Sequence, residues 1–175
     1  MSFEEYQNFD FEDPNFKYEW NNGSLESEER IKPKEAILLK NLQTHLNLSK
    51  HIKDYEILAE MSCYLKSQKI IRIPDIGIYK YSDIKNYIQG NVFFPILAIE
   101  IISPSNQAEE LELKIREYFQ EGVRSVWCIY PKLKQVKVYK SMKESITCNE
   151  DDLCEFQIED HQFSIRVNDL FKDFS

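Results

Sequence analysis

Two acidic residues interrupt stretches of this sequence that are otherwise apolar. Glu100 lies in the run 92–102, and Asp75 lies within the sequence Ile-Pro-Asp-Ile-Gly. A carboxylate in a buried strand loses its hydration, which is costly unless a cation or hydrogen-bond donors compensate. Two such acids on adjacent strands make a site of hard oxygen ligands, the kind that Mg²⁺ prefers. The sequence therefore predicts that Asp75 and Glu100 share a cation.

A lysine in the segment after Glu100 is a third candidate. At about 100° per residue, Ile115 and Tyr118 face the sheet, and Lys114 falls at the edge of this apolar stripe. Its ammonium group could reach the two acids, whereas Arg116 falls on the outer face and is interpreted as a surface charge. A structural role is the alternative, because an aspartate after proline can simply end a strand and a lysine beside an apolar stripe can extend to solvent.

These residues need strands to position them. The stretch 92–102 lacks the polar alternation of a half-exposed strand, so its regular part is predicted to be a central strand covered on both faces. Residues 55–66 and 70–81 are rich in β-branched and aromatic residues. They are predicted to form a pair of strands joined near Ser67-Gln68.

One helix is predicted before these strands in the sequence, and one is predicted after them. Apolar residues at helical spacing indicate a helix over 33–50, with its proline in the first turn. A second helix is expected to begin with Asn106 as its N-cap and Glu109 in the capping-box position, and to end at Gly122.

The remaining segments complete an α/β pattern. Strands are predicted over 124–130 and 135–140, followed by a weaker pair over 153–159 and 162–167 and a short terminal helix. The expected fold is a mixed β-sheet flanked by helices, with a β-rich C-terminal part. The 175 residues suffice for one core, so we predict a single domain over 1–175 with an irregular N-terminal extension over 1–17.

The charge of the chain is unevenly distributed. The net charge of −8 argues against a nucleic-acid binder on the global criterion, since phosphate affinity comes mostly from lysine and arginine. The segment 111–143, however, carries eight basic and three acidic residues. Lys132 and Lys134 in this segment are predicted phosphate contacts, and a solvated strand face is the alternative.

Other classes of protein fit the sequence less well. The four cysteines form no C-x-x-C pair and the three histidines are far apart, so reduced, core-packed thiols are expected rather than a zinc site or a disulfide framework. The longest apolar run ends at Glu100, far short of the ~20 residues of a membrane-spanning helix. The first thirty residues hold nine acids and two bases, unlike a signal peptide, so no membrane contact and a cytoplasmic location are expected.

Several short motifs resemble a known family. They are Arg72-Ile73-Pro74-Asp75-Ile76, Ile99-Glu100-Ile101-Ile102-Ser103-Pro104-Ser105, Lys114-x-x-x-Tyr118, Gly122-Val123-Arg124 and Val126-Trp127. Together they look like the Uma2 (DUF820) family of restriction-endonuclease-like proteins, over most of the chain from about Tyr18-Glu19 to Phe171. The resemblance implies the PD-(D/E)xK nuclease core as the fold.

The resemblance also implies roles for individual residues. In the general PD-(D/E)xK pattern the lysine follows the acid by two residues, but Ile102 occupies that position here. The family is similar in displacing the lysine to the next helix, which fits Lys114. Asp75, Glu100 and Lys114 are then catalytic, with both acids holding the metal. Glu19 matches a frequent family acid and Glu35 stands where relatives often have histidine, and both are weaker candidate ligands.

The implied function is a Mg²⁺-dependent or Mn²⁺-dependent endonuclease that hydrolyses DNA phosphodiester bonds. DNA is the implied partner, no small-molecule organic cofactor is expected, and a homodimer would allow a small nuclease to cut both strands. The alternative is a non-catalytic nucleic-acid-binding or accessory protein that retains the nuclease fold, because fold alone does not fix function. Binding of a divalent metal separates the two readings.

Overall fold

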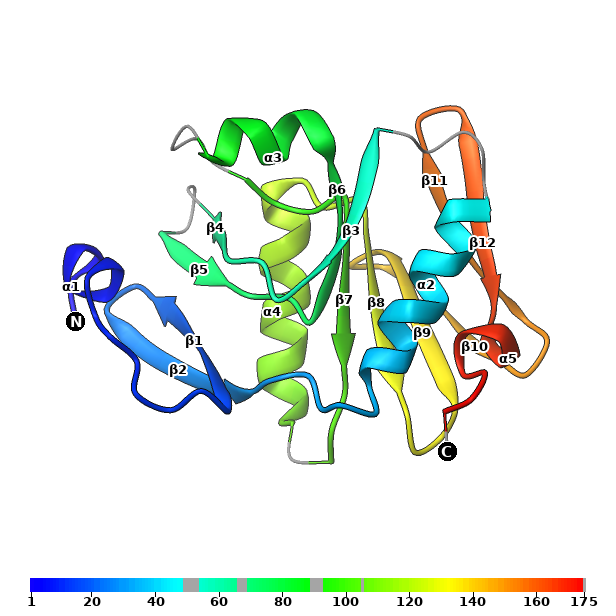
Figure 1. The fold of residues 1–175 in the computed structure, drawn as a ribbon, viewed down its shortest axis with the longest axis horizontal. Helices are drawn as coiled ribbons and strands as arrows, with labels where there is room; N and C mark the ends of the chain where they lie inside the picture. The colour runs from blue at the N-terminus through cyan, green and yellow to red at the C-terminus, as the bar shows by residue number, and fades with distance from the viewer. Residues whose placement is uncertain (49–53, 66–68, 89–92, 105, 175) are drawn as a thin grey trace.

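A six-stranded mixed sheet forms the centre of the protein (Figure 1). The computed structural model describes residues 1–48, 54–65, 69–88, 93–104 and 106–174. The strand order is β10-β9-β8-β7-β6-β3, and only β7 and β8 run parallel. The strands are β3 (Tyr55–Ala59), β6 (Ile76–Lys80), β7 (Leu97–Ile101), β8 (Ser125–Tyr130), β9 (Gln135–Ser141) and β10 (Glu144–Asn149). The predicted central strand is therefore confirmed as β7.

Helices cover both faces of this sheet. On one face, Ile115 and Tyr118 of α4 (Ala108–Glu121) pack against Ala98 of β7 and its neighbours. On the other face, Leu38 of α2 (Ala36–Leu48) packs against Ile99. The same core contains the hairpin of β11 (Leu153–Ile158) and β12 (His161–Arg166) and the short helix α5 (Val167–Leu170). The alternation along β7 turns Glu100 toward α4.

A second, four-stranded sheet has the order β2-β1-β5-β4. Its strands are β1 (Phe16–Asn21), β2 (Ser24–Glu29), β4 (Cys63–Leu65) and β5 (Ile70–Arg72). The predicted strand pair 55–66 and 70–81 is thus divided between the two sheets, although Tyr55↔Lys80 and Cys63↔Arg72 keep one hairpin register. Pro74 lies at the break, where it cannot donate a ladder hydrogen bond. The predicted junction at Ser67-Gln68 lies outside the described residues.

The amino end is more regular than expected. Helix α1 (Phe3–Gln7) begins with a capping box at Ser2, and β1 and β2 form a hairpin. Asn22 and Gly23 form its turn with φ values of 45° and 104°, as a tight two-residue turn requires. The expectation of an irregular extension over 1–17 therefore describes only the stretch between α1 and β1.

The predicted helix ends are correct in part. Helix α2 falls within the predicted range 33–50, and α4 ends at Gly122, whose φ of 102° is left-handed. The N-cap of α4 is Gln107, so the predicted Asn106 cap is wrong. The Asn106 side chain instead accepts hydrogen bonds from the backbone and hydroxyl of Ser103.

Besides α1, β1 and β2 at the amino end, α3 (Tyr81–Ile88) and β10 are described elements that the sequence analysis did not predict. All four cysteines are buried free thiols. In the part of the chain that the structure describes, no helix is long and apolar enough to cross a membrane.

Candidate active site

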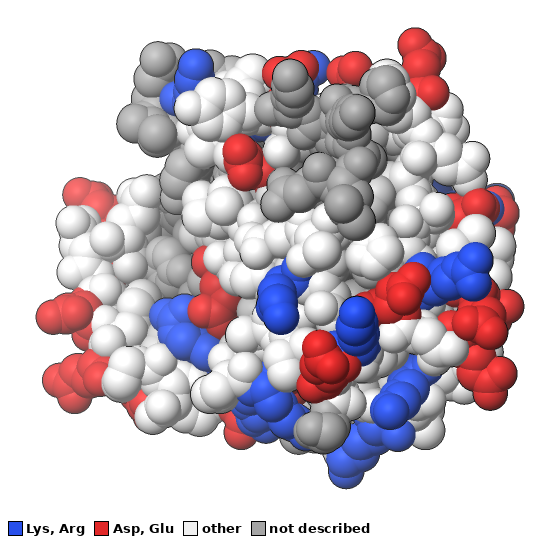
Figure 2. All heavy atoms as spheres, turned by 45° about the vertical axis from the view of Figure 1, so that its right-hand side comes forward, with Lys and Arg blue, Asp and Glu red and all other residues white. Residues whose placement is uncertain are grey.

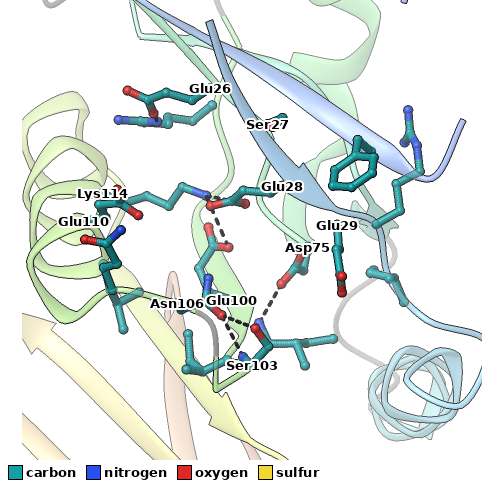
Figure 3. Close-up of a pocket in the computed structure, with 18 of the residues that line it drawn as sticks. Glu26, Ser27, Glu28, Glu29, Asp75, Glu100, Ser103, Asn106, Glu110 and Lys114 are labelled. Carbon is teal, nitrogen blue, oxygen red and sulfur yellow. Dashed lines mark hydrogen bonds and ion pairs between the residues drawn. The ribbon is translucent and has the colours of Figure 1, made fainter. Parts of the chain in front are cut away.

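Asp75 and Glu100 are brought together by the pairing of β6 with β7. The register pairs Ile76 with Ile99, so Asp75 lies one step further along, opposite Glu100. The backbone N–H of Ile101 donates a 2.6 Å hydrogen bond to Oδ2 of Asp75. Both carboxylates line a cleft of about 530 Å³ (Figure 3). The fold therefore delivers two acids, from segments far apart in the sequence, to one site.

Glu100 is buried on the α4 side of the sheet, with 4% of its surface exposed. The hydroxyl of Tyr118 donates a 2.7 Å hydrogen bond to its Oε1. Burial raises the pKa of Glu100 to about 7, against the opposing effect of Lys114 and Lys17. The nearby cations thus compensate only part of the desolvation of this carboxylate.

Asp75 is held by a lysine that the sequence analysis did not single out. Lys17 on β1 is completely buried, and its Nζ donates 2.7 Å hydrogen bonds to Asp75 Oδ1 and to the carbonyl oxygen of Ile73. The two carboxylate oxygens of Asp75 therefore accept from different donors, Lys17 and the amide of Ile101. These bonds fix the orientation of the carboxylate in the cleft.

Lys114 points from α4 into the cleft. It is 5% exposed, so it does not extend to solvent, whereas Arg116 is exposed as predicted. Its Nζ lies 2.9 Å from both carboxylate oxygens of Glu28, 3.2 Å from Glu19 Oε1 and 3.7 Å from Glu100 Oε2. Burial alone would lower the pKa of Lys114, but these three carboxylates raise it well above its ordinary value. Lys114 is therefore a charged ammonium at the site.

The β1–β2 hairpin presents four charged side chains on one face. The register pairs Lys17 with Glu28 and Glu19 with Glu26, and alternate residues of a strand share a face. The sequence signal is the alternation Lys-Tyr-Glu and Glu-Ser-Glu on the two sides of the Asn-Gly turn. Sequence reasoning weighed only Glu19 of these four, because alternating charges ordinarily indicate a solvated face.

Arg72 of β5 anchors this face to the rest of the site. It is 3% exposed, and its Nε lies 2.7 Å from Glu117 while its Nη1 contacts Glu19, at 2.8 Å, and Glu26. Glu19 also accepts a 2.6 Å hydrogen bond from the amide of Ile73. Glu19 is therefore a buried residue that connects Arg72 to Lys114.

Glu35, the other weak candidate, lies at a different place. It lines the cleft close to the start of α2, and its Oε2 accepts a 2.9 Å hydrogen bond from the backbone of Lys32. This contact closes the turn that leads into α2. The structure brings Asp75, Glu100 and Lys114 together, while Glu35 stays at the edge of the helix.

The chemistry of the donor set suits a divalent cation. In the part of the chain that the structure describes, the connected network contains six carboxylates and three cations, Lys17, Arg72 and Lys114. In the described residues no group of three or more His, Cys, Asp or Glu side chains is arranged to hold a metal. Mg²⁺ is commonly held by one or two carboxylates, with water and substrate phosphate completing its shell. Asp75 and Glu100 therefore fit this ion.

The predicted phosphate contacts in the basic segment 111–143 lie outside the cleft, although Lys114 of the same segment lines it. Lys132 and Lys134 are exposed in the turn between β8 and β9 and are not among the residues that line the cleft. Figure 2 shows one side of the molecule, on which lysine and arginine side chains are interspersed with acidic ones. Among the described residues, seven acidic and four basic ones line the cleft. Phosphate contacts by Lys132 and Lys134 stay a prediction.

The chain is similar to known proteins in both sequence and structure. Residues 3–160 match the model of the Uma2 family, described as "Putative restriction endonuclease". The structure is similar to the crystal structure of a putative nuclease belonging to DUF820 from Anabaena variabilis, with a TM-score of 0.77 and 20% sequence identity. The match covers 98% of each chain, and at this identity it establishes the fold. Among curated proteins, none matches the chain.

Proposed function

Since the chain belongs to the Uma2 family of putative restriction endonucleases, we propose that it is a metal-dependent endonuclease that hydrolyses DNA phosphodiester bonds. The observation that carries this proposal is the position of Asp75 opposite Glu100, with Lys114 beside them in one cleft. Two buried acids and an ammonium group are the parts that metal-assisted phosphodiester hydrolysis needs.

Each side chain has a separate task in this proposal. Asp75 and Glu100 would hold Mg²⁺ or Mn²⁺, which supplies a more acidic water and stabilises charge on phosphate oxygens. The Ile101 amide and Tyr118 orient these two carboxylates. Lys114 would orient the attacking water and offset the negative charge that develops on the phosphate.

Cleavage of supercoiled plasmid DNA tests the proposal. We expect nicked or linear product in the presence of Mg²⁺ or Mn²⁺ and none with a chelator. Asp75→Asn and Glu100→Gln should each abolish cleavage, while Glu110→Gln, at another acid that lines the cleft, should retain it. Absence of cleavage by the parent protein with either metal would overturn the proposal.

A second candidate is a non-catalytic nucleic-acid-binding or accessory protein that retains the nuclease fold. The observation in its favour is that Lys114 already forms ion pairs with Glu28 and Glu19. Among the described residues that line the cleft, acidic ones also outnumber basic ones. This candidate predicts DNA binding without strand cleavage and without dependence on Asp75 or Glu100. A homodimer stays a prediction that size-exclusion chromatography with light scattering tests.

A further inference from the structure

Glu28 joins the two buried lysines of the site. Its Oε2 lies 3.2 Å from Lys17 Nζ, and both of its carboxylate oxygens lie 2.9 Å from Lys114 Nζ. Its side chain is 31% exposed and lines the cleft beside Asp75 and Glu100 (Figure 3). Burial would raise the pKa of Glu28, but Lys114 and Lys17 lower it to about 2. Glu28 is therefore an anion held between two ammonium groups at the mouth of the site.

The strand that carries Glu28 lies at an edge of its sheet. Strand β2 is one of the two outer strands of the order β2-β1-β5-β4, and among the described strands it pairs with β1 alone. None of its residues is fully buried. An edge strand of this kind can shift without breaking any other strand pair of its sheet. Glu28 thus belongs to an edge strand, whereas Lys17, Asp75 and Glu100 belong to segments inside the two sheets.

Both lysines keep partners when Glu28 is removed. Lys17 retains Asp75 and the carbonyl of Ile73, and Lys114 retains Glu19 and Glu100. The network therefore does not need Glu28 to neutralise either lysine. What Glu28 adds is a partly exposed carboxylate that lines the cleft and contacts both ammonium groups, that of Lys114 at the cleft and that of Lys17 buried behind it.

We propose that Glu28 is an internal anion that occupies the phosphate position of the site, between Lys17 and Lys114. A carboxylate and a phosphate group accept hydrogen bonds from ammonium groups in the same way, and each carries negative charge. An anionic ligand must displace Glu28 to reach both lysines, so Glu28 weakens the binding of phosphate. The identification of that ligand as a DNA phosphodiester rests on the proposed function.

Inorganic phosphate is the probe that tests this proposal without requiring catalysis. Isothermal titration calorimetry with a metal chelator present would compare the parent with Glu28→Gln, which keeps the shape of the side chain and removes its charge. We expect phosphate to bind roughly tenfold more tightly to Glu28→Gln than to the parent. The reason is that this substitution removes a negative charge that repels phosphate and competes with it for the lysines. Glu29→Gln is the matched control, because Glu29 lies on the same strand and pairs with exposed Lys32.

The Glu29→Gln control distinguishes the effect of direct contact with the two lysines from the effect of a lower negative charge in the cleft. Both variants remove one negative charge from the lining of the cleft, but only Glu28 contacts the two lysines. Equal effects of the two variants, or unchanged or weaker phosphate binding by Glu28→Gln, would overturn the proposal and make Glu28 a residue that positions Lys114. Glu28→Ala serves as a second variant, and circular dichroism checks that each variant is folded.

The outcome is independent of the proposed nuclease activity. Tighter phosphate binding by Glu28→Gln, together with no DNA cleavage by the parent, would support the internal anion and overturn the nuclease proposal. DNA cleavage by the parent, together with unchanged phosphate binding by Glu28→Gln, would overturn the internal anion alone.

Discussion

Asp75 and Glu100 lie opposite each other at the end of the β6–β7 pair, one residue beyond the pairing of Ile76 with Ile99. The same backbone that pairs the strands also orients Asp75, because the amide of Ile101 donates to its Oδ2. The register of the β6–β7 pair therefore determines the relative position of the two acids, and a change in this register would separate them.

Lys114→Ala should reduce cleavage by ~10²–10³, the usual loss for one preorganised group that stabilises transition-state charge. Binding of Mn²⁺ should persist, because Lys114 does not supply a ligand oxygen. The measurement is plasmid cleavage together with Mn²⁺ titration. Arg116→Ala, on the exposed face of the same helix, is the control, and equal activity of the two variants would remove Lys114 from the mechanism.

Lys114→Ala should also destabilise the metal-free protein. The change leaves the buried carboxylates of Glu19 and Glu100 without one of their cations. Breaking such a buried ion pair typically costs about 3–5 kcal/mol. Urea unfolding in the presence of a chelator measures the loss. A free energy of unfolding equal to that of the parent would mean that water solvates this region of the cleft.

Arg72→Met should lower the free energy of unfolding by about 3–5 kcal/mol. Arg72 is buried between Glu19 and Glu117, and its removal leaves both carboxylates with fewer compensating contacts. Arg30→Met, which removes an ion pair between the half-exposed Arg30 and Glu60, should cost no more than about 1 kcal/mol. Urea unfolding of both variants tests the contrast, and similar values for the two would contradict it.

Stability should fall in acid partly through Glu28. Lys114 and Lys17 lower its folded pKa to about 2, from an ordinary value of 4.5. A carboxylate with a lowered pKa stabilises the folded state above its unfolded pKa, and this contribution is lost as the pH falls from 4.5 through 2. Glu28→Gln should therefore reduce the pH dependence of the unfolding free energy in this window. An unchanged slope would contradict the ion pairs of Glu28.

Lys132 and Lys134 give a separate prediction about DNA binding. If they contact phosphates, the double variant Lys132→Glu with Lys134→Glu should bind duplex DNA more weakly. Its salt dependence should also be shallower, by ~0.9 log unit per log unit of salt for each lost contact. Fluorescence anisotropy at several salt concentrations measures both effects. Binding equal to that of the parent would assign the two lysines to a solvated turn.

The sequence predicted the apolar framework of the site well. A continuous apolar run marked β7, the stripe of Ile115 and Tyr118 set the inner face of α4, and that stripe placed Lys114 toward the sheet. These features depend on the burial of apolar side chains, which leaves a clear periodic pattern. The two acids were conspicuous because they interrupt that pattern.

The charged residues that the β1–β2 hairpin adds to the site could not be predicted in the same way. Lys17, Glu26 and Glu28 alternate with other residues along β1 and β2, which is also the pattern of a strand that faces water. Their partners come from distant segments: Asp75 for Lys17, Arg72 for Glu26 and Lys114 for Glu28. The break of the hairpin at Pro74 likewise depends on the meeting of two sheets, which local propensity does not encode.

Titration of the protein with Mn²⁺ tests the central claim most directly. If Asp75 and Glu100 share one ion, calorimetry should show one bound Mn²⁺ in the parent, and both Asp75→Asn and Glu100→Gln should lose it. Glu110→Gln, at another acid that lines the same cleft, should still bind the metal. Absence of Mn²⁺ binding by the parent, or binding that survives both substitutions, would contradict a metal site at the paired ends of β6 and β7.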